Sequence, residues 1–474
     1  MAFTSFAFKP ETPLFPSHAQ VLAYFRDYVA HFGLGPYIRF NTRVQLVERR
    51  EGRWRLTVKG ADEQDQDAAD LQQDAADLEQ DAADPEQLPA TRTPDYADLL
   101  LVANGHYRYP RYPEVPGVQA WIDAGKALHS TWYRRPASAG GGGNGSGERG
   151  KDGAGVAGGG IRDGRDKTKL PLRRKLLIVG GGPSGTDIAD DLRGTADLIL
   201  HAATKPPEHR FANIHGRPRV IAFEDHAGGR VRFADGSVEE GVEYVILATG
   251  YQFWLPFFSE EVLKVAEPPR APLLPDALYN STHHLFPLAR NIWPLQTRTD
   301  EQSHAHYPPH TLAFIGLAKR VITWPVMEAE ARAALAAFAD PSILEGEADG
   351  VRARAERFQG RPYDIHVTEG YEQFVHRNEL YHLAARAREP VAGPGSIAEG
   401  GTYIVQEWEK ELFEHMFVLR RLWVEIVERG EAEAWLKGVG EGGVEDWMEM
   451  ARKMLREAGE AEVGKLDKVE AVAI

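Results

Sequence analysis

The residues that most constrain the fold of this chain are 176–192, which read LLIVGGGPSGTDIADDL. An apolar strand runs directly into glycines at the spacing G-x-G-x-x-G and then into a helix. In such a turn one glycine makes the tight bend, one lets the backbone approach a pyrophosphate, and one lets the helix pack against the strand. The N-terminus of the helix then attracts the phosphates. The stretch therefore predicts a dinucleotide-binding unit, whose candidate contacts are Gly180, Gly182, Pro183, Ser184 and Gly185.

The strand after this motif indicates which dinucleotide is bound. Residues 196–205 read ADLILHAATK, and an NAD enzyme would place an acidic residue after this strand to bind the ribose 2′-hydroxyl. Thr204 and Lys205 stand there instead. Because a cation suits the 2′-phosphate of NADPH, the sequence favours NADPH with Lys205 as a contact. A solvated surface lysine is the alternative.

Two other apolar strands end in a small residue followed by glycine. YADLLLVANGHY, residues 96–107, reads as a buried strand that ends at Asn104-Gly105. VEYVILATGYQFW, residues 242–254, repeats that form at Thr249-Gly250. Two such strands predict two successive nucleotide-binding units in an α/β protein.

The residues before these strands are also well patterned. Ser17 and Gln20 have the spacing of a capping box at the start of an amphipathic helix, and Gly33 suits the end of that helix. Alternating apolar residues on both sides of Glu51-Gly52 predict a β-hairpin.

The last third of the chain has the pattern of helices. Residues 327–338 predict one helix and residues 404–427 another. The apolar residues of the second helix recur at helical spacing, which predicts core packing rather than a cofactor site. They are Trp408, Leu412, Met416, Leu419, Trp423 and Ile426.

Composition excludes several classes of protein. The 474 residues include no cysteine, so there are no disulfides, thiolate ligands or cysteine nucleophiles, and redox chemistry requires a cofactor. Eleven acidic residues between 60 and 91 account for most of the net charge of −15, and the rest of the chain has no basic footprint for nucleic acid. No apolar run reaches the roughly 18 residues of a membrane span, and no secretion signal is recognisable at the N-terminus. We therefore expect a cytoplasmic protein without a membrane span.

Two biased segments interrupt the pattern. Residues 62–89 contain three acidic seven-residue units and predict a solvated insertion, and residues 137–170 are rich in glycine and predict a flexible linker. A loose group of histidines lacks the spacing of a metal site, so no metal is expected. These are His283, His284, His304, His306 and His310.

Five stretches together resemble the flavin-containing monooxygenase family. One is VANGHYRYPRYPEVPG, residues 102–117, which is similar to the family segment in which an Asn-Gly-His turn is followed by spaced prolines. GGGPSGTDIA, residues 180–189, is similar to the NADPH-binding glycine motif of this family, and LATGY, residues 247–251, to its ATG motif. DAGKALHSTWY, residues 123–133, matches the family fingerprint but has Asp123 where phenylalanine is typical. LAFIGLAKRVITWPVMEAEA, residues 312–331, resembles the late flavin-contacting segment.

The resemblance implies an α/β two-dinucleotide-binding-domain flavoprotein, with a Rossmann-like NADPH domain inserted in a discontinuous FAD domain. The segments would be a partial FAD domain 1–136, the linker 137–170, the NADPH domain 171–245, the continuation of the FAD domain 246–335 and a helical region 336–474. The family's first FAD-binding glycine motif has no counterpart before Ser17, so we expect FAD to be held poorly by the chain as written.

The resemblance also implies an activity. NADPH, FAD and O2 would oxygenate a small nitrogen or sulfur compound, as in N,N-dimethylaniline monooxygenase activity, through a C4a-hydroperoxyflavin, and a homodimer is possible. The alternatives are a non-catalytic or truncated NADPH-binding remnant and a Baeyer-Villiger monooxygenase. The resemblance assigns a catalytic role to Asn104. It assigns cofactor contacts to Thr249, Gly250, Tyr251, Gly125, His129, Tyr133 and Gly316.

Overall fold

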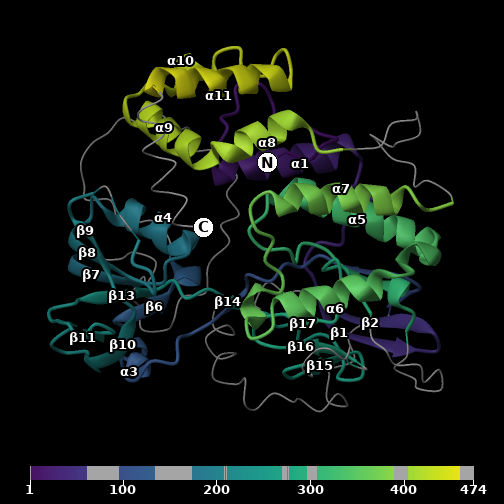
Figure 1. Cartoon of the computed structure of the whole chain (residues 1–474), viewed down its shortest axis with the longest axis horizontal. Coiled ribbons are helices and arrows are strands. Elements are labelled where there is room, and N and C mark those ends of the chain that lie inside the picture. Colours follow the sequence, from purple (N-terminus) through teal and green to yellow (C-terminus); the bar gives the residue numbers. More distant parts are fainter. Residues whose placement is uncertain are drawn as a thin grey trace.

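The structure is a computed structural model that describes most of the chain. The described residues are 2–60, 95–133, 173–207, 209, 211–268, 275, 277–295, 307–388 and 404–459. The predicted insertion 62–89 and linker 137–170 lie outside them, as do His304 and His306. Figure 1 shows two α/β units side by side, with strand β14 (Tyr251–Gln252) between them.

The unit that holds the glycine motif is built on a five-stranded parallel sheet. Its strands, in spatial order, are β6 (Ala127–His129), β13 (Tyr244–Leu247), β7 (Arg173–Val179), β8 (Ala196–Ala202) and β9 (Ile214–Arg217). Because side chains alternate along a strand, Leu176 and Ile178 pack against helix α4 (Pro183–Leu192), whereas Leu177 and Val179 face the opposite side. Strand β6 comes from the segment that the sequence assigned to the FAD domain, so that segment contributes to both units.

The opposite face of this sheet is covered by one helix and a small antiparallel sheet. These are α3 (Val118–Asp123), β10 (Val220–Asp225), β11 (Arg230–Phe233) and β12 (Val238–Glu239). Trp121 of α3 and Phe223 of β10 are buried and contact each other edge to face.

The second unit begins with the predicted helix and hairpin, which are both confirmed. Helix α1 (His18–His31) has the Ser17–Gln20 capping box, and Gly33 follows it at φ +61°. Strands β1 (Thr42–Arg50) and β2 (Arg53–Gly60) pair around Glu51-Gly52, and β3 (Asp95–Ala97) extends their sheet.

Strand β4 (Leu100–Val102) corrects one expectation. It pairs in parallel with β20 (Leu312–Phe314), its one partner among the described residues. The sequence predicted a buried strand, but Leu99 and Leu101 are 41% and 39% exposed. The reason is that the other edge of β4 is not covered by the part of the chain that the structure describes, so alternate side chains face solvent.

Short strands and helices complete this unit. The strands are β5 (Tyr109–Pro110), β15 (Leu263–Val265), β16 (Leu278–Asn280), β17 (Leu285–Phe286), β18 (Leu288–Ala289) and β19 (Trp293–Pro294). The 3-10 turns are η1 (Gly35–Tyr37), η3 (Ser130–Trp132), η4 (Pro309–Thr311), η5 (Pro341–Leu344) and η6 (Pro362–Asp364). The helices are α5 (Thr323–Ala339), which confirms the helix predicted at 327–338, α6 (Glu347–Arg357) and α7 (Glu372–Ala384).

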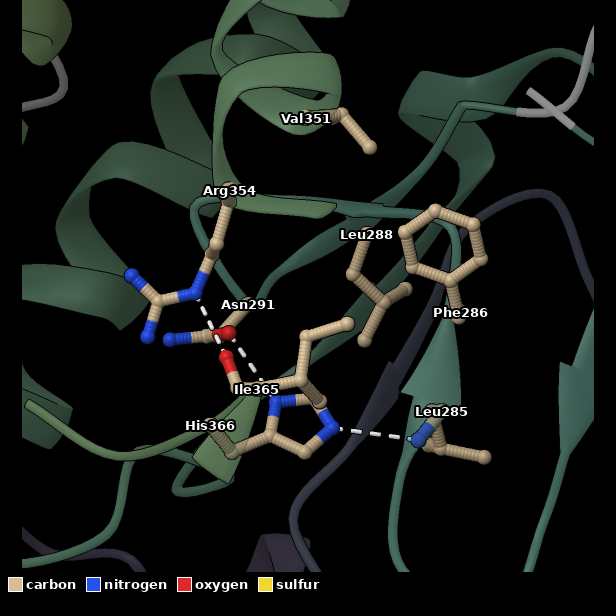
Figure 2. Close-up of a pocket in the computed structure, with 8 residues that line it drawn as sticks. All are labelled: Leu285, Phe286, Leu288, Asn291, Val351, Arg354, Ile365 and His366. Carbon is tan, nitrogen blue, oxygen red and sulfur yellow. Dashed lines mark hydrogen bonds between the residues drawn. The ribbon is translucent and has the colours of Figure 1, made fainter. Parts of the chain in front are cut away.

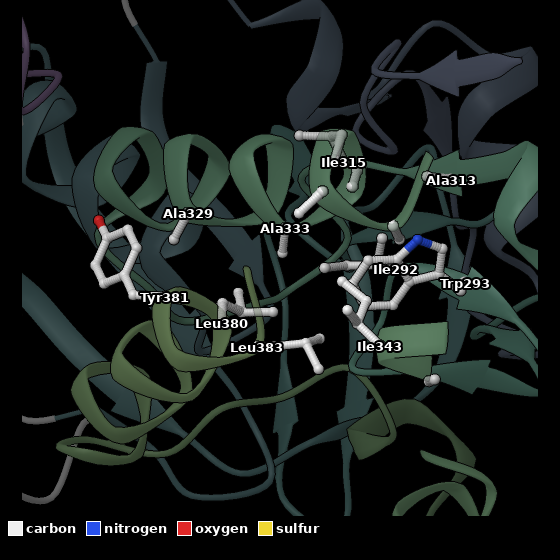
Figure 3. Close-up of a cluster of buried hydrophobic side chains, with 14 of the residues drawn as sticks. Ile292, Trp293, Ala313, Ile315, Ala329, Ala333, Ile343, Leu380, Tyr381 and Leu383 are labelled. Atoms are coloured by element: carbon white, nitrogen blue, oxygen red, sulfur yellow. The ribbon is translucent and has the colours of Figure 1, made fainter. Parts of the chain in front are cut away.

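Alanines let helix α5 approach its neighbours closely. Ala329 and Ala333 of α5 pack against Leu380 and Tyr381 of α7, and Trp293 fills the other end of this cluster (Figure 3). All five side chains are at most 1% exposed, so this cluster fixes α5 in the second unit.

The C-terminal helices differ from the sequence prediction in one respect. Residues 404–427 were expected to form one helix, but α8 (Glu407–Glu414) and α9 (Met416–Glu428) are separate. The two parts pack against different partners: Glu409 of α8 pairs with the buried Arg377 of α7 at 2.6 Å, whereas Trp423 of α9 packs against α11 (Val444–Ala458). Helix α10 (Ala432–Leu436) connects α9 to α11. The predicted core role is confirmed for Leu419, Trp423 and Ile426.

Candidate functional site

The three motif glycines have three different surroundings. Gly180 has φ +122°, and a Cβ there would lie 2.1 Å from the carbonyl oxygen of Ala248. A Cβ on Gly185 would lie 2.1 Å from the carbonyl oxygen of Gly180. Gly182 has an ordinary φ of −80°, and a Cβ there would meet nothing within 4 Å. Two glycines therefore allow the turn to close, and Gly182 faces open space.

The N-terminus of α4 is open to an anion. Gly182 is the N-cap residue and provides no side-chain hydrogen bond, and Pro183 occupies the first turn, which contains no acidic residue. The N–H groups at a helix N-terminus carry a partial positive charge that a phosphate can neutralise. Open space at Gly182 and an uncapped helix end are the two features that a bound pyrophosphate requires.

Lys205 lies beside this turn. It follows β8 by three residues, its side chain is exposed, and its carbonyl oxygen is 3.8 Å from the position of a Cβ on Gly181. Thr204 is also exposed.

A buried histidine that the sequence analysis did not select supports the turn. His201 Nε2 donates to the carbonyl oxygen of Gly180 at 2.8 Å, and its Nδ1 lies 2.8 Å from Nε2 of His209. Burial lowers the pKa of His201 to about 4, so the ring is neutral, and its Nδ1 accepts a hydrogen bond from Nε2 of His209. The polar residue in the apolar run LILHAA was the signal that could have identified His201.

Asn104 and Gly316 lie at the same end of the second unit. Strands β4 and β20 are parallel and pair Val102 with Phe314, so Asn104 and Gly316 each follow the paired residue by two positions. Asn104 is exposed, and a Cβ on Gly105, at φ +74°, would meet nothing within 4 Å. Ligands of α/β sheets bind at the carboxyl ends of parallel strands, and the turn after β4 is open there.

The two units meet where β5 pairs with β14. Tyr109 and Pro110 pair with Gln252 and Tyr251, and the backbone N–H of Arg111 donates to the carbonyl oxygen of Gly250 at 3.0 Å. The Arg111 side chain donates to the carbonyl oxygen of Thr249 at 2.7 Å. We call this region, residues 104–111 and 249–253, the crossing.

The fingerprint residues reach the crossing from β6. His129 is fully buried, and its Nε2 donates to the carbonyl oxygen of Gly250 at 2.9 Å. Burial lowers the pKa of His129 to about 4, which keeps the ring neutral. Tyr133 instead donates to Asp191 of α4, and burial followed by that carboxylate raises the pKa of the Tyr133 hydroxyl. Gly125 is at φ +66° in the turn before β6.

Comparisons with known proteins agree with this arrangement. A family model described as flavin-binding monooxygenase-like matches residues 209–282. The flavin-containing monooxygenase GS-OX5 of Arabidopsis thaliana is 25% identical over 55% of this chain and 46% of the relative. The thiol-specific monooxygenase of Saccharomyces cerevisiae is 24% identical over 70% of this chain and 60% of the relative. The chain is therefore similar to flavin-containing monooxygenases over part of its length.

The fold class predicted from the sequence is also confirmed. The solved structure of an S-allyl-L-cysteine S-oxygenase from Allium sativum has a TM-score of 0.57, covers 96% of this chain and 82% of that chain, and is 17% identical. The chain spans about half the length of the curated relatives that it matches.

The residues present fit the phosphates of a dinucleotide at α4, because Gly182 leaves the space that a Cβ would fill. At the second unit, the open turn at Asn104-Gly105 leaves backbone accessible to a planar ring. Gly316 is less open, since a Cβ there would lie 2.3 Å from Cε of Met327, and its N–H donates to Glu330 Oε2 at 2.7 Å. The fit is therefore complete for the motif glycines and partial for the β4–β20 end.

A small cavity in the second unit is not large enough for a cofactor. Its volume is about 10 Å³, which is room for about one water molecule. Figure 2 shows His366 donating from Nδ1 to Asn291 Oδ1 at 2.9 Å and accepting at Nε2 from the N–H of Leu285 at 3.0 Å, while Arg354 donates to the carbonyl oxygen of Ile365 at 2.5 Å. These polar groups satisfy one another, so the cavity is structural.

Within the described residues, no group of three or more His, Asp or Glu side chains could hold a metal ion. No helix in that part of the chain is long and apolar enough to cross a membrane.

Proposed function

We propose that this chain is an FAD- and NADPH-dependent monooxygenase that oxygenates a small compound with a soft sulfur or nitrogen atom. The observation that carries the proposal is the open Gly182 beside the uncapped N-terminus of α4. The names of the relatives, a thiol-specific monooxygenase and an S-allyl-L-cysteine S-oxygenase, favour sulfur.

The motif residues would hold NADPH. Gly180 and Gly185 would shape the turn, Gly182 and Ser184 would bind the pyrophosphate through their backbone, and Lys205 would bind the 2′-phosphate. These roles follow from the open helix end and from the exposed lysine next to it.

The crossing would hold the reacting ends of both cofactors. Thr249, Gly250 and Tyr251 would support the nicotinamide, with His129 fixing the carbonyl of Gly250. Asn104 and Gly316 would contact the flavin at the carboxyl ends of β4 and β20. The predicted roles of Gly125 and Tyr133 would be indirect, since Gly125 shapes the turn before β6 and Tyr133 anchors on α4.

When bound, the cofactors supply the redox chemistry: NADPH provides two electrons, one oxygen atom of O2 joins the substrate, and the other leaves as water with two protons. The protein positions the groups and limits access of bulk water. The homodimer, the cytoplasmic location and the domain limits stay predictions.

The test combines binding with turnover. The purified chain is titrated with NADPH and FAD and then assayed for NADPH oxidation and sulfoxide formation with methyl p-tolyl sulfide. Because the sequence predicts weak FAD binding, FAD is added in excess, and we then expect sulfoxide in proportion to the NADPH consumed. The control is Gly182→Val, which should fold, because its backbone is extended and a side chain meets no protein atom, but should lose NADPH.

Other outcomes would contradict the proposal in identifiable ways. NADPH binding without any oxygenation would indicate a non-catalytic nucleotide-binding protein. Ester formation from cyclohexanone, with no sulfoxide, would indicate a Baeyer-Villiger monooxygenase. Unchanged NADPH affinity in Gly182→Val would remove the motif from the site.

A further inference from the structure

A buried lysine lies next to the crossing. Lys319 follows Gly316 by three residues and is 7% exposed. Its Nζ lies 4.7 Å from the ring centroid of Phe253 and 4.3 Å from that of Tyr363. It donates weakly, at 3.3 Å in both cases, to the carbonyl oxygens of His283 and Tyr363. The ammonium group is thus enclosed by two rings and two carbonyls.

The charges around Lys319 do not balance. Among the described residues, neither Lys319 nor Arg111 has a carboxylate within ion-pair distance. Burial lowers the pKa of Lys319 to about 8; the charge of Asp364 acts in the opposite direction, and the charges of Arg111 and Arg320 lower the pKa further. A buried cation without a counter-ion is costly, so an anion at this place would be stabilised.

Lys319 and Arg111 lie at or next to the crossing, where the two units meet. Lys319 follows β20 at its carboxyl end, close enough to His106 for its charge to act on that ring. Arg111 belongs to the crossing, and its guanidinium lies 5.8 Å from the ring centroid of Tyr363. Tyr363 is 41% exposed, so it separates the cationic pair from solvent only in part.

We propose that Lys319 and Arg111 bind the carboxylate of the substrate, so that the chain oxygenates small thioether acids in preference to neutral sulfides. The inference rests on the proposed function, because it specifies the substrate of that same site. A single carboxylate matches one lysine and one arginine, and the rings of Phe253 and Tyr363 suit the apolar part of the molecule.

Cofactor phosphates are a less suitable anion for this pair. The pyrophosphate and the 2′-phosphate of NADPH are accounted for at α4 and Lys205, in the other unit. The groups around Nζ of Lys319 are aromatic rings and backbone carbonyls, and ring faces suit an organic acid better than a multiply charged phosphate.

The experiment measures binding without turnover. Calorimetric titrations of the full chain use 3-(methylthio)propanoate and its primary amide, which match in size and in the sulfur atom but differ in charge. The variants are Lys319→Met, which removes the charge, and Lys319→Arg, which keeps it. Lys453→Met is the matched control, because that lysine also lies over an aromatic ring, 4.1 Å from the centroid of Trp435, but in α11.

We expect the unmodified chain to bind the acid about tenfold or more tightly than the amide. Lys319→Met should abolish this preference with unchanged NADPH affinity, while Lys319→Arg and Lys453→Met should retain it. Equal binding of acid and amide by the unmodified chain would overturn the inference, as would a preference that persists in Lys319→Met. A loss of NADPH or FAD affinity in Lys319→Met, with acid binding intact, would assign the lysine to a cofactor and also overturn it.

A separate readout tests the proposed function. If the acid binds with the expected preference but neither it nor methyl p-tolyl sulfide is oxygenated, the monooxygenase proposal fails while the anion site stands. If methyl p-tolyl sulfide is oxygenated and the acid shows no preference, the anion site fails while the monooxygenase proposal stands.

Discussion

Replacing Glu330 by glutamine should stabilise the protein, and more so as the pH rises. Glu330 lies on α5 with a fully buried side chain. Its Oε2 accepts from the N–H of Gly316 at 2.7 Å, and its Oε1 has no partner among the described residues. Burial raises the pKa of this carboxyl to about 8, with the Gly316 bond acting in the opposite direction, so the carboxyl is mostly protonated at pH 7.

The size of the effect follows from proton linkage. Between its ordinary value of 4.5 and about 8, the folded protein keeps a proton on Glu330 that the unfolded chain releases. The contribution of Glu330 to the free energy of unfolding is therefore fully present below pH 4.5. It falls by about 1.4 kcal/mol per pH unit between pH 4.5 and about pH 8. At pH 7 the loss amounts to roughly 3 kcal/mol, which a glutamine avoids while its carbonyl still accepts from Gly316.

The assay compares the two proteins at several pH values. Hydrogen exchange of α5 peptides reports the local free energy of opening, and urea unfolding followed by tryptophan fluorescence reports the cooperative transition. The matched control is Glu328→Gln on the same helix, because Glu328 pairs with Arg332 at 2.9 Å and accepts from Thr4. That substitution should be neutral or destabilising.

The pH dependence decides whether the reasoning is correct. We expect the stability difference between Glu330→Gln and the unmodified chain to widen from pH 5 to pH 8 and then to level off. A difference that is the same at pH 5 and pH 8 would refute the idea that Glu330 is neutral in the folded protein. A difference that shrinks with rising pH would mean that the folded state stabilises the carboxylate.

Three further predictions concern other parts of the structure. Gly185→Ala should destabilise the protein by about 2 kcal/mol or more, seen in thermal unfolding, because its Cβ would lie 2.1 Å from the carbonyl oxygen of Gly180. Lys205→Ala should weaken NADPH roughly 10- to 100-fold and leave NADH unchanged in titrations, and equal losses would exclude the 2′-phosphate contact. The free energy of unfolding should fall as the pH drops from 6.5 toward 4. Burial lowers the pKa of His284 to about 4 and that of His366 well below 6.5, so the unfolded chain binds protons that the folded chain does not. Urea midpoints that stay constant over this range would contradict this prediction.

Local patterns in the sequence were sufficient where one segment determines its own structure. The Ser17–Gln20 capping box, the turn at Glu51-Gly52 and the strand, turn and helix around Gly182 all depend on residues close in sequence. Their conformations follow from hydrogen bonds and backbone geometry within a few residues, so the sequence predicted them correctly. The family resemblance added the order of the two units.

Local patterns failed where a distant partner decides the outcome. The apolar run around Leu101 reads as a buried strand, but its exposure depends on which strands pair with β4. The break between α8 and α9 at His415 follows from packing on two different helices, and no glycine or proline marks it. The helical period alone therefore predicted one helix.

The crossing illustrates why site residues are harder to predict than elements. His129, Gly250, Arg111 and Lys319 come from four separate segments. The family motifs marked His129 and Gly250, but nothing in the sequence marked Arg111 or Lys319. The pairing of β5 with β14 brings Arg111 next to Thr249-Gly250, and the parallel pair β4–β20 brings residues after Gly316 to the same place. Lys319 and Arg111 are therefore neighbours only because the β5–β14 pair and the β4–β20 pair lie close together. Substrate charge is then selected by the contact between the units, and variants that loosen the β5–β14 pairing should lose acid selectivity before they lose NADPH binding at α4.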